Sequence, residues 1–233
     1  HTYKKMSKSD SAVHYYKIAA QKLLKHKNFS GAVESYINLA GLYEKQYNNL
    51  DSAKKYIDEA RAIMQSHSSI DRNITEIYYT NLADFYREQG SEKKALEYAH
   101  KGLLSLEDSA HTDTNRFSAP EISLNTIRRA TLSLYESKIE ALIALFEITD
   151  HPDELQILKE HFKQYDKYFL IFMNENTNKE RIKNSLASYR ATLDMVIDFY
   201  HSSSHFKPGD KKTLFALISR GKGIEMLIEK HQM

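Results

Sequence analysis

The 233-residue chain contains no cysteine, which excludes disulfide bonds, thiolate metal sites and cysteine nucleophiles within it. It has only 7 glycines and 3 prolines, too few for the many tight turns of an all-β domain. It has no run of about 18 apolar residues, so we expect no membrane insertion by this chain. The 33 basic residues nearly balance the 31 acidic ones, so no overall field favours nucleic acid or an anionic membrane surface. Long helices joined by short loops are the natural remaining architecture.

Apolar residues instead recur three and four positions apart along almost the whole chain, the pattern of amphipathic helices. We therefore predict an all-α fold. Nine helices are expected, at residues 10–26, 30–46, 51–65, 70–89, 91–106, 120–148, from after 152 to 173, 179–202 and 210–230. The expected N-caps of the second, third and fifth helices are Ser30, Asp51 and Ser91. Gly90 supplies the turn before the fifth helix, and Pro120 suits the first turn of the sixth.

The predicted organisation has one candidate boundary. Residues 108–119 are polar and aperiodic and are expected to form a loop. Before it, residues 1–107 contain the clearest helix pairs. After it, residues 120–233 continue an up-and-down helical pattern, either as degenerate repeats of the same stack or as a C-terminal helical bundle.

Two stretches share one order of large and small residues, with equivalent positions 43 residues apart. Each has an aromatic residue, a Leu-Ala pair and a second aromatic residue on one helix, followed by small residues on the next. The first stretch contains Tyr36, Leu39, Ala40, Tyr43, Ala53, Ile57 and Ala60; the second contains Tyr79, Leu82, Ala83, Tyr86, Gly90, Ala95, Ala99 and Gly102. This order resembles the tetratricopeptide repeat over about residues 30–107 and is degenerate afterwards.

The resemblance implies antiparallel helix pairs stacked in a right-handed superhelix. Ala83 and Ala95 would then face each other where the two helices approach most closely, and Ala99 and Gly102 would let the following repeat dock. The chain departs from the family pattern in three ways. Tyr replaces Trp at the first aromatic position, Pro is absent from the repeat ends, and the period exceeds the family's usual value of about 34 residues.

In this family the first helix of each pair lines a concave face that binds partners. The outward positions on these helices are the candidate partner-binding residues: Ile37, Asn38, Gly41, Glu44 and Lys45 on the earlier helix, and Ile77, Thr80, Asn81, Asp84, Arg87 and Glu88 on the later one. Such a mixture can hold a peptide through its backbone and a few charges. The competing interpretation is a solvated helix face. Because Asp84 would repel a carboxylate, the set disfavours a receptor for C-terminal chaperone tails.

Other motifs carry little chemistry. The tyrosines at repeat spacing are predicted to pack in the core rather than to form a binding stripe. His201 and His205 have a spacing that suits a metal, but they lie at an expected helix end. Residues 219–223, Ser-Arg-Gly-Lys-Gly, lack the spacing of a phosphate-binding loop. We therefore expect no catalytic residues, metal or cofactor.

The sequence thus favours a non-enzymatic scaffold that binds a protein or peptide. The alternative is a sensory or regulatory region of a larger bacterial signalling protein. Under that reading, helix 210–230 resembles the helix that ends the repeat region before a CHAT protease domain, and similar repeats precede sensor histidine kinases. The chain begins at His1, which suggests a processed or excised product. Cytoplasm and periplasm are equally compatible with its composition.

Overall fold

The computed structural model describes residues 2–106, 115–122, 127–175 and 178–232. Within these residues the chain is all-helical, as predicted, with no strand. The elements are α1 (Thr2–Lys25), α2 (Phe29–Lys45), α3 (Leu50–Ser66), α4 (Arg72–Glu88), α5 (Glu92–Leu104), α6 (Arg129–Ile148), α7 (Glu154–Glu175), α8 (Lys179–Ser202), a 3-10 turn (Pro208–Asp210) and α9 (Lys211–Gln232). Of these helices, none combines the length and apolar character needed to cross a membrane.

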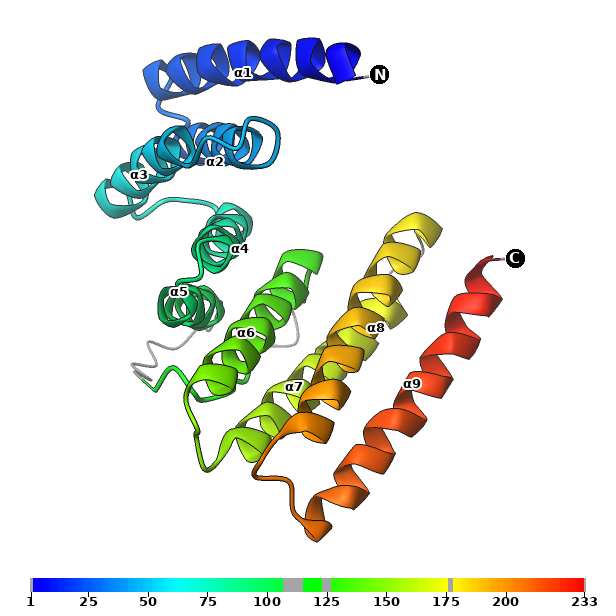
Figure 1. Ribbon diagram of the computed structural model, residues 1–233. Coiled ribbons are helices and arrows are strands. Elements are labelled where there is room, and N and C mark those ends of the chain that lie inside the picture. Colours follow the sequence, from blue (N-terminus) through cyan, green and yellow to red (C-terminus); the bar gives the residue numbers. More distant parts are fainter. Residues whose placement is uncertain (1, 107–114, 123–126, 176–177, 233) are drawn as a thin grey trace.

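The helices stack in chain order along a curved arc that has α1 at one end and α9 at the other (Figure 1). Sequential helices pack against each other as pairs, α2 with α3 and α4 with α5. In this arc α2 and α4 lie on the inner side, and α3 and α5 lie on the outer side (Figure 1). Contacts between α2 and α4 join the two pairs. This packing of neighbouring helices is consistent with a helical repeat.

Asparagine side chains cap several helices at positions just before the predicted caps. Asn28 Oδ1 accepts a hydrogen bond from the Gly31 amide at 2.9 Å, and Asn49 Oδ1 accepts one from the Ser52 amide at 2.9 Å. The predicted caps Ser30 and Asp51 therefore lie inside the first turn of α2 and α3. Ser30 Oγ instead accepts from the backbone amide of Asp71 at 2.9 Å, which ties α2 to the start of α4. Ser91 is the N-cap of α5 without a side-chain bond.

The sixth helix begins later than predicted, at Arg129 rather than near Pro120. Described residues around Pro120 are not helical because buried tyrosines bind their backbone. The Tyr135 hydroxyl donates to the Pro120 carbonyl, and the Ile122 amide donates to Tyr168 Oη at 2.7 Å. The predicted loop at 108–119 falls partly on residues 107–114, which lie outside the described residues.

The small residues of the two repeat stretches lie in the core. Ala40, Ala53, Ala83 and Ala95 are at most 4% exposed. Leu39 and Leu82 are buried beside them. Two apolar clusters result, one within α2, α3 and α4, and one that extends from α5 through α6, α7 and α8 to α9. The size order read from the sequence therefore corresponds to close helix packing.

The two clusters meet where α6 packs against both α4 and α5. Gly102 in α5 lies at this junction. A β-carbon there would be 2.7 Å from Leu134 Cδ2 of α6 and 2.8 Å from Tyr79 Cβ of α4. Helix α6 thus continues the stack directly from α5, on the far side of the predicted boundary.

Candidate functional site

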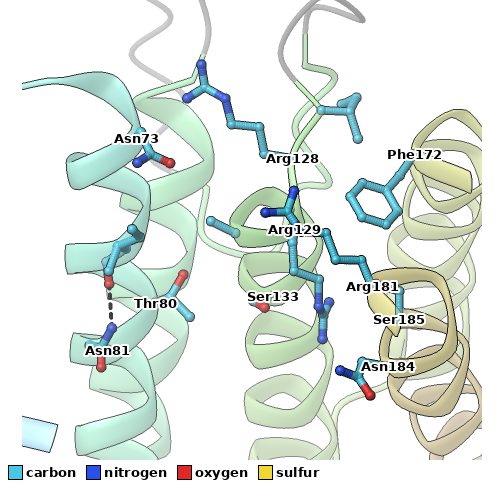
Figure 2. A pocket seen from close by; sticks show the side chains of 13 residues that line it. Asn73, Thr80, Asn81, Arg128, Arg129, Ser133, Phe172, Arg181, Asn184 and Ser185 are labelled. Carbon is cyan, nitrogen blue, oxygen red and sulfur yellow. Dashed lines mark hydrogen bonds between the residues drawn. The ribbon is translucent and has the colours of Figure 1, made fainter. Parts of the chain in front are cut away.

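A groove of about 700 Å³ opens between α4, α6 and α8, and we call it the α4–α6–α8 groove. A groove of this size is within the usual range for ligand sites. Its walls come from both halves of the sequence, since α4 precedes the predicted boundary and α6 and α8 follow it. Its lining residues are Asn73, Ile77, Thr80, Asn81, Ile127, Arg128, Arg129, Ala130, Ser133, Phe172, Arg181, Asn184 and Ser185. Figure 2 shows these side chains converging from separate helices.

The groove combines an apolar part with a positively charged rim. Ile77, Ile127, Ala130 and Phe172 supply apolar surface. Three arginines line it, and the lining includes no aspartate or glutamate. Arg129 and Arg181 lie near the N-terminal ends of α6 and α8, where the helix dipole adds positive potential. Both features favour an anionic group over a cationic one.

The three arginines differ in how their charge is used. Arg129 makes two bonds to Glu136, at 2.8 and 3.0 Å, and one to Ser188 Oγ at 2.7 Å, so it is held in place and largely neutralised. Arg128 is 47% exposed, with its Nη1 3.7 Å from Glu76 Oε1. Arg181 is exposed, and its guanidinium has no ion pair among the described residues. Arg181 is thus the cation most available to a ligand.

Glu76 lies behind Arg128 and is fully buried at 0% exposure. Neither of its carboxylate oxygens has a hydrogen-bond donor in the described chain. Burial raises the pKa of Glu76 to about 7, although Arg128 and Arg72 act in the opposite direction. A buried carboxylate without hydrogen bonds is costly to ionise. At 3.7 Å the contact between Glu76 and Arg128 is an ion pair without a hydrogen bond. The guanidinium N–H groups of Arg128 are therefore not used by Glu76.

Ser185 is a second buried polar group on the groove wall. Its side chain is 1% exposed and lines the groove, and its hydroxyl has no hydrogen-bond partner in the described chain. It lies one helical turn from Arg181 on the same face of α8 (Figure 2). An unmatched buried hydroxyl costs about 1–3 kcal/mol unless something binds it.

The candidate partner-binding residues divide into two groups along α4. Ile77, Thr80 and Asn81 line the groove. Asn81 Nδ2 donates to the Ile77 carbonyl at 2.8 Å, which fixes its amide (Figure 2). These three are the sequence-predicted residues that the fold brings to the groove.

The other candidates on α4 lie nearer its C-terminal end, where α6 contacts them. Ser137 Oγ donates to Asp84 Oδ1 at 2.9 Å, and Arg87 pairs with both Asp84 and Glu140. Asp84 and Arg87 are each 29% exposed. Their charges therefore join α4 to α6 within the chain.

The candidates on α2 lie outside the groove. Ile37 was expected to point outward but is only 4% exposed, because α2 packs against α1, α3 and α4 and its apolar side chains are covered. Asn38, Gly41 and Glu44 are half-buried. Burial raises the pKa of Glu44. Lys45 and Glu88 are exposed at the ends of α2 and α4.

The repeat-spaced tyrosines pack within the helix pairs, as predicted. Tyr36 and Tyr43 stack on Tyr56 at 6.0 and 5.5 Å between ring centroids, and Tyr86 stacks on Tyr98 at 5.2 Å. All five rings pack against the apolar cluster within α2, α3 and α4. Lys17 and Lys94 lie over Tyr43 and Tyr86, covering their faces.

The other motifs are also integrated into the fold. Arg220, in the glycine-containing stretch 219–223, is helical and pairs with Asp166 at 2.9 Å. His205 lies 3.5 Å from Asp150 and 3.4 Å from Glu154. Within the described residues, no group of three or more His, Cys, Asp or Glu side chains is arranged to hold a metal ion.

Most of the groove could not be found from the two repeat-like stretches, because their outward positions end at Glu88. Arg128, Arg129, Arg181, Asn184 and Ser185 all lie beyond that point. The adjacent pair Arg128-Arg129 before an apolar helix was a visible signal. The contribution of α8 was not visible, because only the packing of α8 near α6 brings Arg181 there.

Comparisons with known proteins assign the chain to no family. No family model and no curated protein matches the chain. Among solved structures, the chain is similar to the crystal structure of BtubC (BKLC) from P. vanneervenii, with 13% identity and a TM-score of 0.47 over 98% of this chain and 92% of that chain. A likeness at this level carries no argument about function.

Proposed function

We propose that this chain is a tetratricopeptide-like module that binds a protein or peptide segment without catalysis, and that the segment lies in the α4–α6–α8 groove. The observation that carries the proposal is the groove itself, which combines apolar and hydrogen-bonding side chains from several helices. Such a mixture suits a peptide, whose apolar side chains fill the floor while amide and guanidinium groups bind its backbone.

The groove is built on helices rather than loops, which lowers the cost of ordering the receptor on binding. Arg129 is fixed by Glu136 and Ser188, and Asn81 is fixed by the Ile77 carbonyl. Side chains that are already held in one conformation lose little entropy when a partner arrives. Contacts of Asp84 and Arg87 with α6 further hold two walls of the groove together.

A peptide-display selection on the intact chain tests the proposal. Random twelve-residue peptides are selected on the immobilised protein, and enriched peptides are then measured in solution by fluorescence anisotropy. The test variant is Asn184→Trp, which places a large ring at an exposed groove position. The matched control is Lys183→Trp, at the neighbouring exposed position that does not line the groove.

We expect Asn184→Trp to weaken binding by about tenfold or more, equivalent to about 1.4 kcal/mol, while Lys183→Trp leaves affinity unchanged. Circular dichroism checks that both variants keep their helix content. If no peptide is enriched, or if both variants bind as the wild type does, the groove is not a peptide site.

A further inference from the structure

Charge and unmatched hydrogen-bonding groups in the α4–α6–α8 groove specify the chemistry of its ligand. We propose that the bound peptide segment is anionic, and that its carboxylate or phosphoryl oxygens contact Arg181, Arg128 and the Ser185 hydroxyl. This inference rests on the proposed function. It adds a ligand class that the groove's shape alone does not give.

The first argument is the local charge. The groove lining contains three arginines and no carboxylate. Behind it, Glu136 is fully engaged by Arg129, and Glu76 is shared by Arg128 and Arg72. Guanidinium groups therefore outnumber carboxylates at this place, although the whole chain has a formal net charge of only +2. A planar guanidinium binds carboxylate and phosphate oxygens through paired hydrogen bonds.

The second argument is the pair of donors that the chain leaves without partners. Arg181 has no ion pair among the described residues, and Ser185 is 1% exposed with an unmatched hydroxyl. Both line the groove from one face of α8. A buried hydroxyl that nothing in the chain binds lowers stability, and an oxygen-bearing ligand between Arg181 and Ser185 would recover that cost.

The third argument is the arrangement around the start of α6. Arg128 and Arg129 occupy the cap and the first position of that helix, where the positive end of the helix dipole favours an anion. Asn73 and Asn184 add amide groups from α4 and α8. Figure 2 shows Asn73 and Arg181 on opposite sides of this point. A cationic segment would meet no carboxylate in this lining.

The same random twelve-residue library tests this inference when selected in parallel on the wild type, Arg181→Gln and the control Lys183→Gln. We expect peptides selected on the wild type and on Lys183→Gln to be enriched in Asp and Glu, and those selected on Arg181→Gln to lose that enrichment. Arg181 is preferred over Arg128 as the test position, because removal of Arg128 would take away one of the two cations that act on the buried Glu76.

Synthetic forms of one enriched peptide then separate the sources of charge. Each acidic residue is replaced by Gln, by Lys or by phosphoserine, and affinity is measured in 50 and 300 mM salt. We expect about a tenfold loss with Gln, a larger loss with Lys, and weaker binding of the acidic peptide at the higher salt concentration. The phosphoserine form shows whether carboxylate or phosphoryl oxygens fit better.

Ser185→Ala separates a role in ligand binding from a role in packing, because the two roles predict different changes in stability. We expect this variant to unfold at slightly higher urea concentration than the wild type and yet to bind the acidic peptide about threefold more weakly, because it removes an unmatched donor that the ligand uses. Loss of both stability and affinity would instead mean that Ser185 serves packing.

The outcomes distinguish this inference from the function on which it rests. Enriched peptides without acidic residues, or with basic ones, would overturn the anionic ligand and leave a peptide-binding groove in place. Acidic peptides that bind Arg181→Gln as tightly as the wild type would overturn the assigned contacts. A selection without any enrichment would overturn both proposals.

Discussion

At Gly102, the absence of a side chain lets three helices meet. A β-carbon there would approach Leu134 Cδ2 of α6, which can rotate away, and Tyr79 Cβ of α4, which is fixed to its helix backbone. A β-carbon added to Gly41, in α2, would have no neighbouring atom within 4 Å. The two glycines therefore separate the steric effect of a methyl group from its effect on helix propensity.

We expect Gly102→Ala to lower the free energy of unfolding by about 1–3 kcal/mol, the usual cost of overpacking. Gly41→Ala is the control and should raise it by about 0.5–1 kcal/mol, because alanine is the better helix former. Urea unfolding followed by far-ultraviolet circular dichroism measures both. Equal stabilisation by the two variants would show that α4, α5 and α6 do not approach closely at Gly102.

Glu76 makes the stability of the protein depend on pH. Burial raises its pKa to about 7 in the folded chain, whereas an unfolded glutamate titrates near 4.3. Between these values the folded state holds a proton that the unfolded state has lost, so stability from this group falls as pH rises from about 4.3 to 7. Above that range the folded protein bears the full cost of the buried charge.

Glu76→Gln should therefore stabilise the protein more at pH 8 than at pH 5, by a difference on the order of 1–2 kcal/mol. Thermal unfolding of variant and wild type at both pH values measures it. The pKa of His161, which burial lowers to about 3, changes stability equally in both proteins and cancels. Glu88→Gln, an exposed carboxylate on the same helix, controls for net charge. If Glu76→Gln stabilised the protein equally at pH 5 and pH 8, this would contradict a raised pKa at Glu76.

At the scale of single helices, asparagine side chains that bind free amides set the starts of α2, α3 and α8. Helix α8 was predicted at 179–202 and runs from Lys179 to Ser202. It starts at Lys179 because Asn178 Oδ1 accepts a hydrogen bond from the Arg181 amide. Helix α2 begins one residue before the predicted cap, since Asn28 rather than Ser30 binds the Gly31 amide. The sequence offers several capping residues in a row, and the direction of the preceding chain selects one of them.

Replacement of Asn28 by Ala should cost about 1 kcal/mol of unfolding free energy, the typical value for an N-cap. Ser30→Ala should cost less, because Ser30 Oγ accepts one exposed amide bond from Asp71 and alanine favours the helix. Equilibrium urea unfolding of the two variants compares them. The opposite order would identify Ser30 as the cap.

At the scale of the whole molecule, α6 continues the stack from α4 and α5. Gly102, Tyr79 and Leu134 pack where the two apolar clusters meet, and the Arg87–Glu140 pair crosses the same interface. In stacked helices, stability depends strongly on such contacts between neighbours. The region around residues 108–119 therefore need not separate two independently folding parts.

We expect urea unfolding to show one transition, with the same midpoint by circular dichroism and by tyrosine fluorescence. The chain suits this comparison, because tyrosines lie in or against both clusters and the sequence has no tryptophan to dominate the emission. Leu134→Ala should lower the single midpoint. Two separate transitions, with only the later one shifted by Leu134→Ala, would indicate two domains divided near residue 115.

The sequence by itself determined the helical class, most helix ends and the core positions of small residues such as Ala83 and Ala95, because these depend on spacing and size along a single helix. Tertiary structure decided which polar side chains remain available to a partner. Asp84 and Arg87 were expected to face a ligand, but residues of α6 that lie 53 positions further along the chain engage both. Arg181 and Ser185 line the groove because α8 lies next to α6. No local sequence pattern encodes which helices become neighbours.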